Sequence, residues 1–269
     1  MTHLRAICSS LALFCSPLAA QAQTALDGVV SHRVIPGWTQ RDGSHMAGLE
    51  LTLAPGWKTY WRSPGDAGIP PKFDWTGARN IQDVMVAWPT PTVFWQYGMR
   101  SIGYDTKVVL PLTVTPKRDG KAMRLKGRMD LGICSDVCLP AQIRIDAALP
   151  PESATRPSAL VAALAALPYD SFVAGVKDTH CTITPSETGL NVTASIIVPH
   201  TGGTEETVIE PPKPGVWVSE AQTHRSGDTL IATAEMISVS QAPFVIDRSD
   251  IRITILGSKH AVDIQGCPG

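Results

Sequence analysis

Short alternating segments, separated by glycine and proline, constrain the fold of this chain more than any other feature. Between about residues 29 and 149 the apolar side chains recur at every second position, as in Leu49, Leu51 and Leu53. A period of two is the pattern of a strand with one buried face. The clearest expected strands here are 46–53, 108–114, 123–129 and 141–147. Strands that follow one another without helices between them predict an antiparallel sandwich.

A second strand-rich block follows a proline-dense boundary at 150–157. The segment 158–167 between them has a helical pattern, with Ser158 as a candidate N-cap, and we expect a short connecting helix without chemistry that packs on a domain edge. The clearest strands of the second block are 189–198, 216–218, 229–234 and 251–256. The sequence therefore predicts an all-β chain with sandwich domains at 23–150 and 171–269, joined by a linker with a short helix at 151–170.

The N-terminal residues 1–22 have the layout of a secretory signal peptide. Arg5 is the basic residue, 6–18 is a short apolar run, and Ala20-Gln21-Ala22 is a cleavage motif. The apolar run is too short for a convincing membrane anchor, and no later segment approaches the length of a span. We therefore expect an exported protein that does not cross the membrane after cleavage. Cys15 raises a lipoprotein alternative, but the residues before it are not the small ones that a lipidation site needs.

Charge excludes two classes of partner. The formal net charge is −1, and the basic residues form no cluster. A nucleic-acid-binding surface or attraction to an anionic membrane needs such a cluster, so we expect neither.

Cysteine spacing separates two kinds of disulfide. Signal cleavage would remove Cys8 and Cys15 and leave four of the six cysteines in an oxidising compartment. A Cys134–Cys138 bond would close a very small loop, and loop closure would then stabilise the fold by about 2 kcal/mol. A Cys181–Cys267 bond would close a loop that includes most of a domain, and the stabilisation would be about 4.6 kcal/mol. Strained or exposed disulfides are the readily reduced ones. We therefore expect Cys181–Cys267 to be a structural disulfide and Cys134–Cys138 to be a redox pair.

Two cysteines four residues apart are by themselves a weak signal. They also fit a structural loop clip or half of a metal site, but no second cysteine pair or paired histidines complete a zinc site. Copper(I) could use both thiolates with Met99 or Met129, although methionine at strand spacing is more often a core residue. The chain has no serine-hydrolase elbow, phosphate loop or nicotinamide fingerprint. We predict no metal and no cofactor.

Aromatic residues gather ahead of the cysteines. Five of the seven tryptophans fall between Trp57 and Trp95, in stretches rich in glycine and proline. We expect Trp57 and Trp75 in the core. Aromatic side chains on surface loops commonly cover or recognise something, and the Cys134–Cys138 disulfide is the plausible target.

Several ordered motifs carry a resemblance to a known family. They are the aromatic run 56–71, Trp88-Pro89, the run 101–104 ahead of 108–114, and the cysteine pair followed by Leu139-Pro140. Over about residues 29–149 the chain resembles the N-terminal periplasmic domain of DsbD-type protein-disulfide reductases, with the closest likeness to the ScsB branch, which is associated with suppression of copper sensitivity. The second block resembles the second sandwich of ScsB N-terminal regions.

The resemblance implies immunoglobulin-like domains and thiol–disulfide exchange in the periplasm. Electrons would come from a thioredoxin-like or membrane-embedded partner and pass to exported thiol proteins. By position, Cys138 would form the mixed disulfide with a partner and Cys134 would resolve it. The resemblance places the cap loop and the aromatic segment beside the cysteines at Phe94, Trp95, Tyr97 and Gly98, and at Tyr60 and Trp61.

Two departures from the family stand out. The acidic residues of its cap loop have no counterpart in 94–97, and its membrane domain and C-terminal thioredoxin domain have no counterpart in this chain. A non-enzymatic module therefore stays open as the alternative, either a copper chaperone or an immunoglobulin-like assembly domain with two structural disulfides. A reduction potential of Cys134–Cys138 near those of working oxidoreductases would support exchange, and one below about −300 mV would indicate a structural bond.

Overall fold

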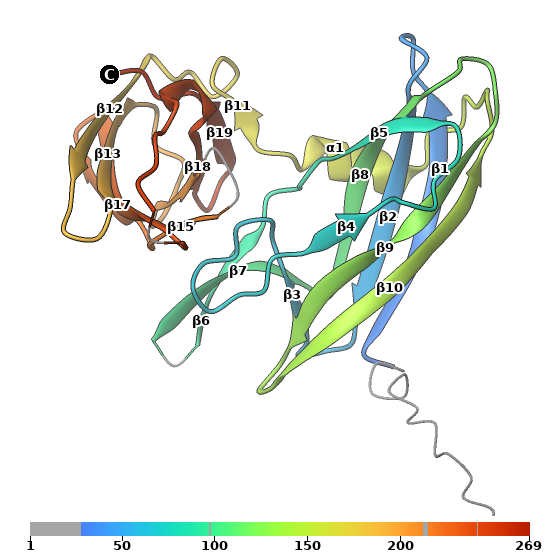
Figure 1. The fold of residues 1–269 in the computed structure, drawn as a ribbon, viewed down its shortest axis with the longest axis horizontal. Coiled ribbons are helices and arrows are strands. Elements are labelled where there is room, and N and C mark those ends of the chain that lie inside the picture. The colour runs from blue at the N-terminus through green and yellow to red at the C-terminus, as the bar shows by residue number, and fades with distance from the viewer. Residues whose placement is uncertain (1–27, 97, 212–214, 241) are drawn as a thin grey trace, which may run out of the picture.

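The structure is a computed structural model that describes residues 28–96, 98–211, 215–240 and 242–269. The expected signal peptide, with Cys8 and Cys15, lies outside the described residues. Strands dominate the described chain and form two sandwiches that are joined by a single α-helix (Figure 1). The predicted all-β class is confirmed.

The first sandwich contains two facing antiparallel sheets. One has the order β1-β2-β8-β5, and the other has the order β10-β9-β3-β7-β6, with β4 paired to β9. Their bounds are β1 (Val30–Thr39), β2 (His45–Leu53), β8 (Lys107–Pro116), β5 (Ile81–Val86), β10 (Cys138–Leu149), β9 (Met123–Cys134), β3 (Lys58–Tyr60), β7 (Met99–Asp105), β6 (Thr92–Gln96) and β4 (Lys72–Asp74). Alternate side chains of the long strands, such as Leu49, Leu110 and Leu125, fill the space between the sheets.

The second sandwich repeats this plan. One sheet has the order β11-β19-β18-β14, and the other β12-β13-β17-β15, with β16 paired to β17. The bounds are β11 (Tyr169–Asp170), β19 (Ala261–Gln265), β18 (Arg252–Leu256), β14 (Glu206–Glu210), β12 (Asp178–Pro185), β13 (Leu190–Ile197), β17 (Thr229–Ser238), β15 (Val216–Val218) and β16 (Gln222–Ser226). A short 3-10 helix, η1 (Arg248–Asp250), precedes β18. The pairing of β11 with β19 is parallel, and this first strand of the second sandwich falls within the segment expected as linker.

A disulfide joins Cys181 of β12 to Cys267, just after β19. Cys181 belongs to one sheet of the second sandwich, Cys267 directly follows a strand of the other sheet, and both side chains are fully buried. The bond therefore connects the two layers and holds the end of the chain against the core.

The helix α1 (Ser158–Ala165) packs on the outer face of the first sandwich. Its Leu160 and Ala163 are buried in a cluster with Ile35, Trp38, Met46 and Val109 of β1, β2 and β8. A β-bulge in β1 makes room for the helix. Gly37 in this bulge has φ of +62°, and a side chain at this position would collide with the Met46 carbonyl and crowd Leu160. The prediction that Ser158 is the N-cap was wrong. Pro157 holds that place with an extended backbone, and its carbonyl accepts from the Leu160 and Val161 amides.

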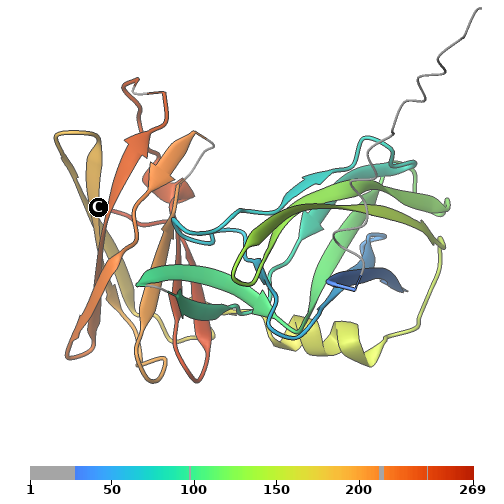
Figure 2. The same ribbon diagram turned by 90° about the horizontal axis from the view of Figure 1, so that it is seen from below.

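The two sandwiches also contact each other directly. Val208, Leu256 and Ala261 of the second sandwich belong to the same apolar cluster as the first core. The β6–β7 hairpin extends from the first sandwich toward the second (Figure 2). No helix of the described residues has the length and apolarity that a membrane crossing requires.

Candidate redox site

The Cys134–Cys138 pair closes the end of the long β9–β10 hairpin. Cys134 is the last residue of β9 and Cys138 the first of β10, and the two are direct partners in the register. Their sulfurs form a disulfide, and their Cα atoms are 4.1 Å apart. Between them, the Ser135 amide donates to the Val137 carbonyl at 3.0 Å. The bond therefore sits at an exposed turn and not in the body of the sandwich.

The two sulfur-bearing residues differ strongly in exposure. Cys134 is 1 % exposed, whereas Cys138 is exposed. Sheet order is the cause: β9 has β10 on one side and β3 on the other, where Lys58 pairs with Cys134. Strand β10 is the outer strand of its sheet. An incoming thiolate would therefore reach Cys138 more easily than Cys134.

The Tyr60 hydroxyl lies between the sulfurs and a neighbouring loop. It donates to Cys134 Sγ at 2.9 Å, and it also lies 3.5 Å from Cys138 Sγ and 3.2 Å from the Ala67 carbonyl oxygen. A phenol has one proton, so it serves one of these acceptors at a time. Burial raises the pKa of Tyr60 above its ordinary value of 10, and the hydroxyl therefore stays a donor at neutral pH.

Trp61, the next residue, points to the opposite side. Its side chain is fully buried in the core of the first sandwich, where the Arg62 guanidinium carbon lies 3.9 Å from its ring centroid. Successive residues of an extended segment face opposite sides, which explains why the side chains of Tyr60 and Trp61 point in opposite directions. Trp61 thus packs in the core, and Tyr60 meets the sulfurs.

A small hollow of about 140 Å³ opens beside the disulfide. Its lining brings together β3, the segment after β3, the β6–β7 hairpin and the cysteine turn. Besides the two cysteines, the lining residues are Lys58, Tyr60, Ala67, Gln96, Met99, Ser101, Ser135 and Asp136. A larger hollow of about 580 Å³ adjoins it, shares Lys58, Gln96, Ser135 and Asp136, and includes Trp57 and Phe94.

The residues expected in the cap loop are divided among several places. Phe94 lines the larger hollow, Trp95 is 58 % exposed, and Gly98 is exposed at the turn with φ of +77°. Tyr97 lies outside the described residues. The same hairpin reaches the disulfide hollow with Gln96 and Met99.

Sequence reasoning missed Lys58, which connects the hairpin to the strand beside the cysteines. Its ammonium donates to Gln96 Oε1 at 2.8 Å and lies 5.3 Å from the Phe94 ring centroid. The strand period could have found it, because Lys58 and Tyr60 are two residues apart and share one face.

The two methionines weighed as copper ligands differ in position. Met129 is a core residue at 1 % exposure, and Met99 is 57 % exposed and lines the disulfide hollow. Trp57 and Trp75, which the sequence predicts in the core, are partly buried and pack against the first core. Within the described ranges, no three or more His, Cys, Asp or Glu side chains gather as a metal site would require.

Comparison with known proteins identifies a matching family model and a similar solved structure. Residues 31–150 match the family model described as the N-terminal domain of the thiol:disulfide interchange protein DsbD. The crystal structure of the N-terminal periplasmic domain of ScsB from Proteus mirabilis is similar, with a TM-score of 0.69 and 24% sequence identity over 90% of this chain and 94% of that one. No curated protein matches. The resemblance predicted from the motifs is confirmed, and the fold is shared across both sandwiches.

Proposed function

We propose that this chain, with residues 31–150 matching the DsbD N-terminal family, carries a periplasmic thiol–disulfide exchange module. Reducing equivalents would pass from a thioredoxin-like or membrane-embedded donor to exported thiol proteins through Cys134 and Cys138. The observation that carries the proposal is the asymmetry of the pair. One cysteine is exposed on an outer strand, and the other is buried and accepts a hydrogen bond from Tyr60.

The first half-reaction begins at Cys138. A donor thiolate attacks Cys138 Sγ, the Cys134–Cys138 bond breaks, and a donor–Cys138 disulfide forms while Cys134 leaves as a thiolate. The Tyr60 hydroxyl is placed to donate a hydrogen bond to that leaving sulfur. The second donor thiolate then displaces Cys138. The donor becomes a disulfide, and the pair gains two electrons and takes up two protons.

The second half-reaction reverses these roles. The Cys138 thiolate attacks a disulfide of the acceptor protein and forms a mixed disulfide with one acceptor sulfur, while the other leaves as a thiolate. Cys134 then attacks Cys138 Sγ and releases that first sulfur, so the acceptor is reduced and the Cys134–Cys138 bond is restored. Because Cys134 is buried, an external disulfide reaches it less easily than Cys138. Cys134 therefore reacts with the mixed disulfide at Cys138 and not with an external partner.

Trapping of partner adducts tests this assignment. A Cys134→Ala variant should accumulate mixed disulfides through Cys138 in the periplasm, and Cys138→Ala should accumulate few. The variant that lacks both cysteines controls for unspecific adducts. Equal trapping by both single variants, or trapping through Cys134 alone, would overturn the order of attack. A wild-type potential below about −300 mV would instead overturn the exchange function.

One observation favours a second candidate function, binding of copper(I). Met99 lines the same hollow as Cys134 and Cys138, and thioether and thiolate sulfurs are the soft ligands that copper(I) prefers. Only the reduced pair offers thiolates. Copper(I) titration of the reduced protein against a competing chelator tests this candidate, and Met99→Leu should then weaken the affinity. An affinity that Met99→Leu leaves unchanged would argue against it.

A further inference from the structure

The disulfide hollow has two walls that are neither long strands nor helices. Tyr60 and Ala67 come from β3 and the irregular segment after it, and Met99 and Ser101 come from the start of β7. The walls are tied to each other near Ile102, whose amide donates to the Pro64 carbonyl and whose carbonyl accepts from the Trp61 amide, at 2.9 and 3.0 Å. They therefore form one unit beside the sulfurs.

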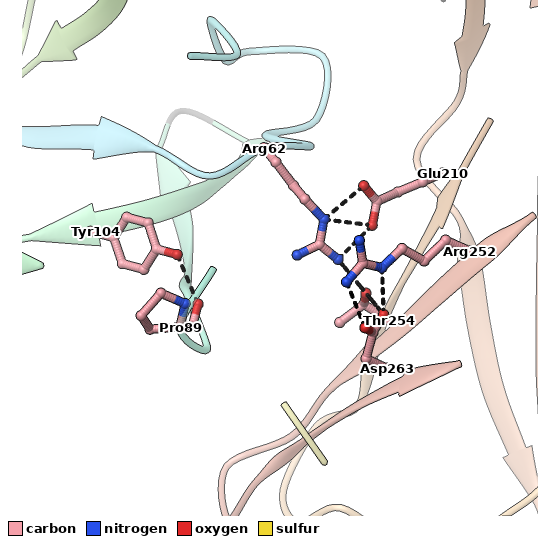
Figure 3. A network of polar contacts seen from close by, with 7 residues as sticks. All are labelled: Arg62, Pro89, Tyr104, Glu210, Arg252, Thr254 and Asp263. Carbon is pink, nitrogen blue, oxygen red and sulfur yellow. Dashed lines mark hydrogen bonds and ion pairs between the residues drawn. The ribbon is translucent and has the colours of Figure 1, made fainter. Parts of the chain in front are cut away.

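Arg62 fastens the first wall to the second sandwich. Its guanidinium pairs with Glu210 of β14 through three contacts of 2.7–3.1 Å and donates to Thr254 Oγ1 of β18 at 3.1 Å (Figure 3). Asp263 of β19 lies 3.8 Å away and is also paired with Arg252 at 2.6 Å. The Arg62 and Glu210 side chains are 12% and 15% exposed. Arg62 follows Tyr60 by two residues, so this network begins next to the phenol that contacts Cys134.

Arg100 fastens the second wall in the same way. It lies between Met99 and Ser101, which both line the hollow, and its side chain is 3% exposed. Its guanidinium pairs with Glu206 Oε2 of β14 at 2.7 Å, and Glu220 Oε1 lies 3.3 Å from its Nε without hydrogen-bond geometry.

A third polar contact reaches the loop beside Ala67. The Trp217 indole N–H of β15 donates to Asp66 Oδ1 at 3.1 Å. Each of the three contacts from the second sandwich thus ends within two residues of a side chain that lines the disulfide hollow.

The chemistry of this contact favours one docking geometry. A guanidinium taken out of water needs its carboxylate partner, and loss of one partner leaves a buried charge unpaired. Val208, Leu256 and Ala261 also make apolar contact with the first core. Apolar contact is not directional, so it tolerates small rotations of one sandwich against the other. The arginine pairs set the register of the docked sandwiches.

We propose that the second sandwich positions the walls of the disulfide hollow through Arg62 and Arg100. Docking keeps Tyr60 on the Cys134 sulfur and keeps the hollow narrow, and undocking loosens both walls and exposes the buried cysteine. The two arginines are positioning residues, because they touch neither sulfur. The consequence for electron transfer rests on the exchange function proposed above, whereas the control of access to Cys134 does not.

The test changes the second sandwich and leaves the hollow intact. The full chain with both Glu206→Gln and Glu210→Gln loses the carboxylate that lies nearest to each arginine, while Glu220 and Asp263 stay at 3.3 and 3.8 Å. Glu235→Gln is the matched control, since Glu235 is held by Ser186 and Thr188 within the second sandwich. Each protein is reduced chemically and alkylated while folded, and the labelling rate of Cys134 is read by mass mapping. Hydrogen exchange of the 60–68 and 99–103 amides is followed alongside.

The double variant should label Cys134 at least about tenfold faster than wild type, the factor that corresponds to ~1.4 kcal/mol of lost docking free energy. The rate of amide hydrogen exchange in both walls should rise, and the reduction potential of Cys134–Cys138 should shift. Arg100→Met should behave alike, with Arg100→Lys restoring part of the protection. Circular dichroism and an intact Cys181–Cys267 bond establish that each variant is folded. If Arg100→Met does not fold, the double variant with Glu206→Gln and Glu210→Gln still provides the test.

An unchanged Cys134 labelling rate in the folded double variant would overturn the proposal, even if exchange rises, because the second sandwich would then stabilise the segment without controlling the site. Labelling starts from the chemically reduced Cys134–Cys138 pair, so its rate reports access to Cys134 whatever the natural potential of the pair is. A wild-type potential below about −300 mV would sink the exchange function and leave this comparison standing.

Discussion

The Tyr60 hydroxyl lies within reach of both sulfurs, and its contact with Cys134 is the shorter at 2.9 Å. A hydrogen bond donated to a sulfur stabilises the thiolate that leaves when the disulfide is attacked. Burial keeps the phenol protonated through neutral pH because it raises the pKa of Tyr60. One residue thus supplies a hydrogen-bond donor that lies within reach of both sulfurs.

Tyr60→Phe should slow reduction of the disulfide by a dithiol roughly tenfold, because a hydrogen bond to a charged group is worth about 1.5–3 kcal/mol. The reduction potential should fall by about 30 mV, the equivalent of ~1.4 kcal/mol in a two-electron couple. Tyr104→Phe is the matched control, since that phenol donates to the Pro89 carbonyl at 2.7 Å and not to sulfur (Figure 3). Stopped-flow reduction and equilibration with glutathione measure both quantities, and unchanged values in Tyr60→Phe would remove its role.

Glu205 of the second sandwich provides a pH-dependent prediction. Desolvation opposes its ionisation, but hydrogen bonds from Arg225 and Thr201 outweigh this and lower its pKa from 4.5 to about 2. Because the folded-state pKa is depressed, the stabilisation is present above pH 4.5 and is lost as pH falls toward 2. Glu205→Gln should therefore lower the free energy of unfolding by about 2 kcal/mol at pH 7 and by much less near pH 2.

Urea unfolding of wild type and variant at pH 7 and near pH 2 measures this difference. Glu235→Gln is again the comparison. A Glu205→Gln deficit that is the same at both pH values would contradict an ionised, hydrogen-bonded Glu205 as its source.

At the scale of elements, the β6–β7 hairpin is held by Lys58 of β3. The lysine donates to Gln96 and faces the Phe94 ring, while Trp95 of the same hairpin is largely exposed. The alternation of side chains along β6 explains the difference, because Phe94 and Gln96 lie on one face of the strand and Trp95 lies on the opposite face. We therefore propose that Gln96, Met99 and Phe94 contribute more than Trp95 to covering the disulfide.

Lys58→Met should open the hairpin and admit larger reagents to the reduced pair. Loss of the lysine charge also lowers thiolate reactivity, so the rate with a bulky alkylating agent is compared with the rate for a small one. The bulky-to-small ratio should rise about fivefold, because only the bulky reagent senses the opening and surface polar contacts are worth about 1 kcal/mol. Lys107→Met, which removes an exposed lysine paired with Glu50, is the control. A ratio equal to wild type would contradict the role of Lys58.

The sequence predicts the long strands well and the short ones poorly. Strands β2, β8, β13 and β17 carry several alternating apolar residues, and a period of two predicts them directly. Strands β3 and β4 have three residues each and lie among glycine and proline, so no period emerges. Their places depend on pairing with β9, which is a tertiary effect.

The candidate site shows the same division. The spacing of the cysteines and the motifs around them lead to Cys134 and Cys138, and the family resemblance adds Tyr60. The contacts of Arg62 with Glu210 and of Arg100 with Glu206 join residues 148 and 106 positions apart, and no local pattern could predict them. The register of two docked sandwiches decides these contacts.

At the scale of the whole molecule, the two disulfides occupy opposite kinds of position. Cys181–Cys267 joins the two sheets of the second sandwich, spans 86 residues and has both side chains fully buried. Cys134–Cys138 spans 4 residues at a hairpin end and has one exposed partner. Loop closure alone assigns about 4.6 kcal/mol to the first bond and about 2 kcal/mol to the second. Accessibility and loop entropy therefore rank the two bonds in the same order.

Mild dithiol treatment of the folded protein should reduce Cys134–Cys138 first, because a thiolate must reach a sulfur in order to attack it and Cys138 alone among the four is exposed. Alkylation after increasing times, followed by mass mapping, should label Cys134 and Cys138 while Cys181 and Cys267 stay bonded. The same treatment in denaturant is the control, since unfolding opens the long loop and should remove the difference in access. Labelling of Cys181 and Cys267 first in the folded chain would reverse the assignment and make the second sandwich the redox-active one.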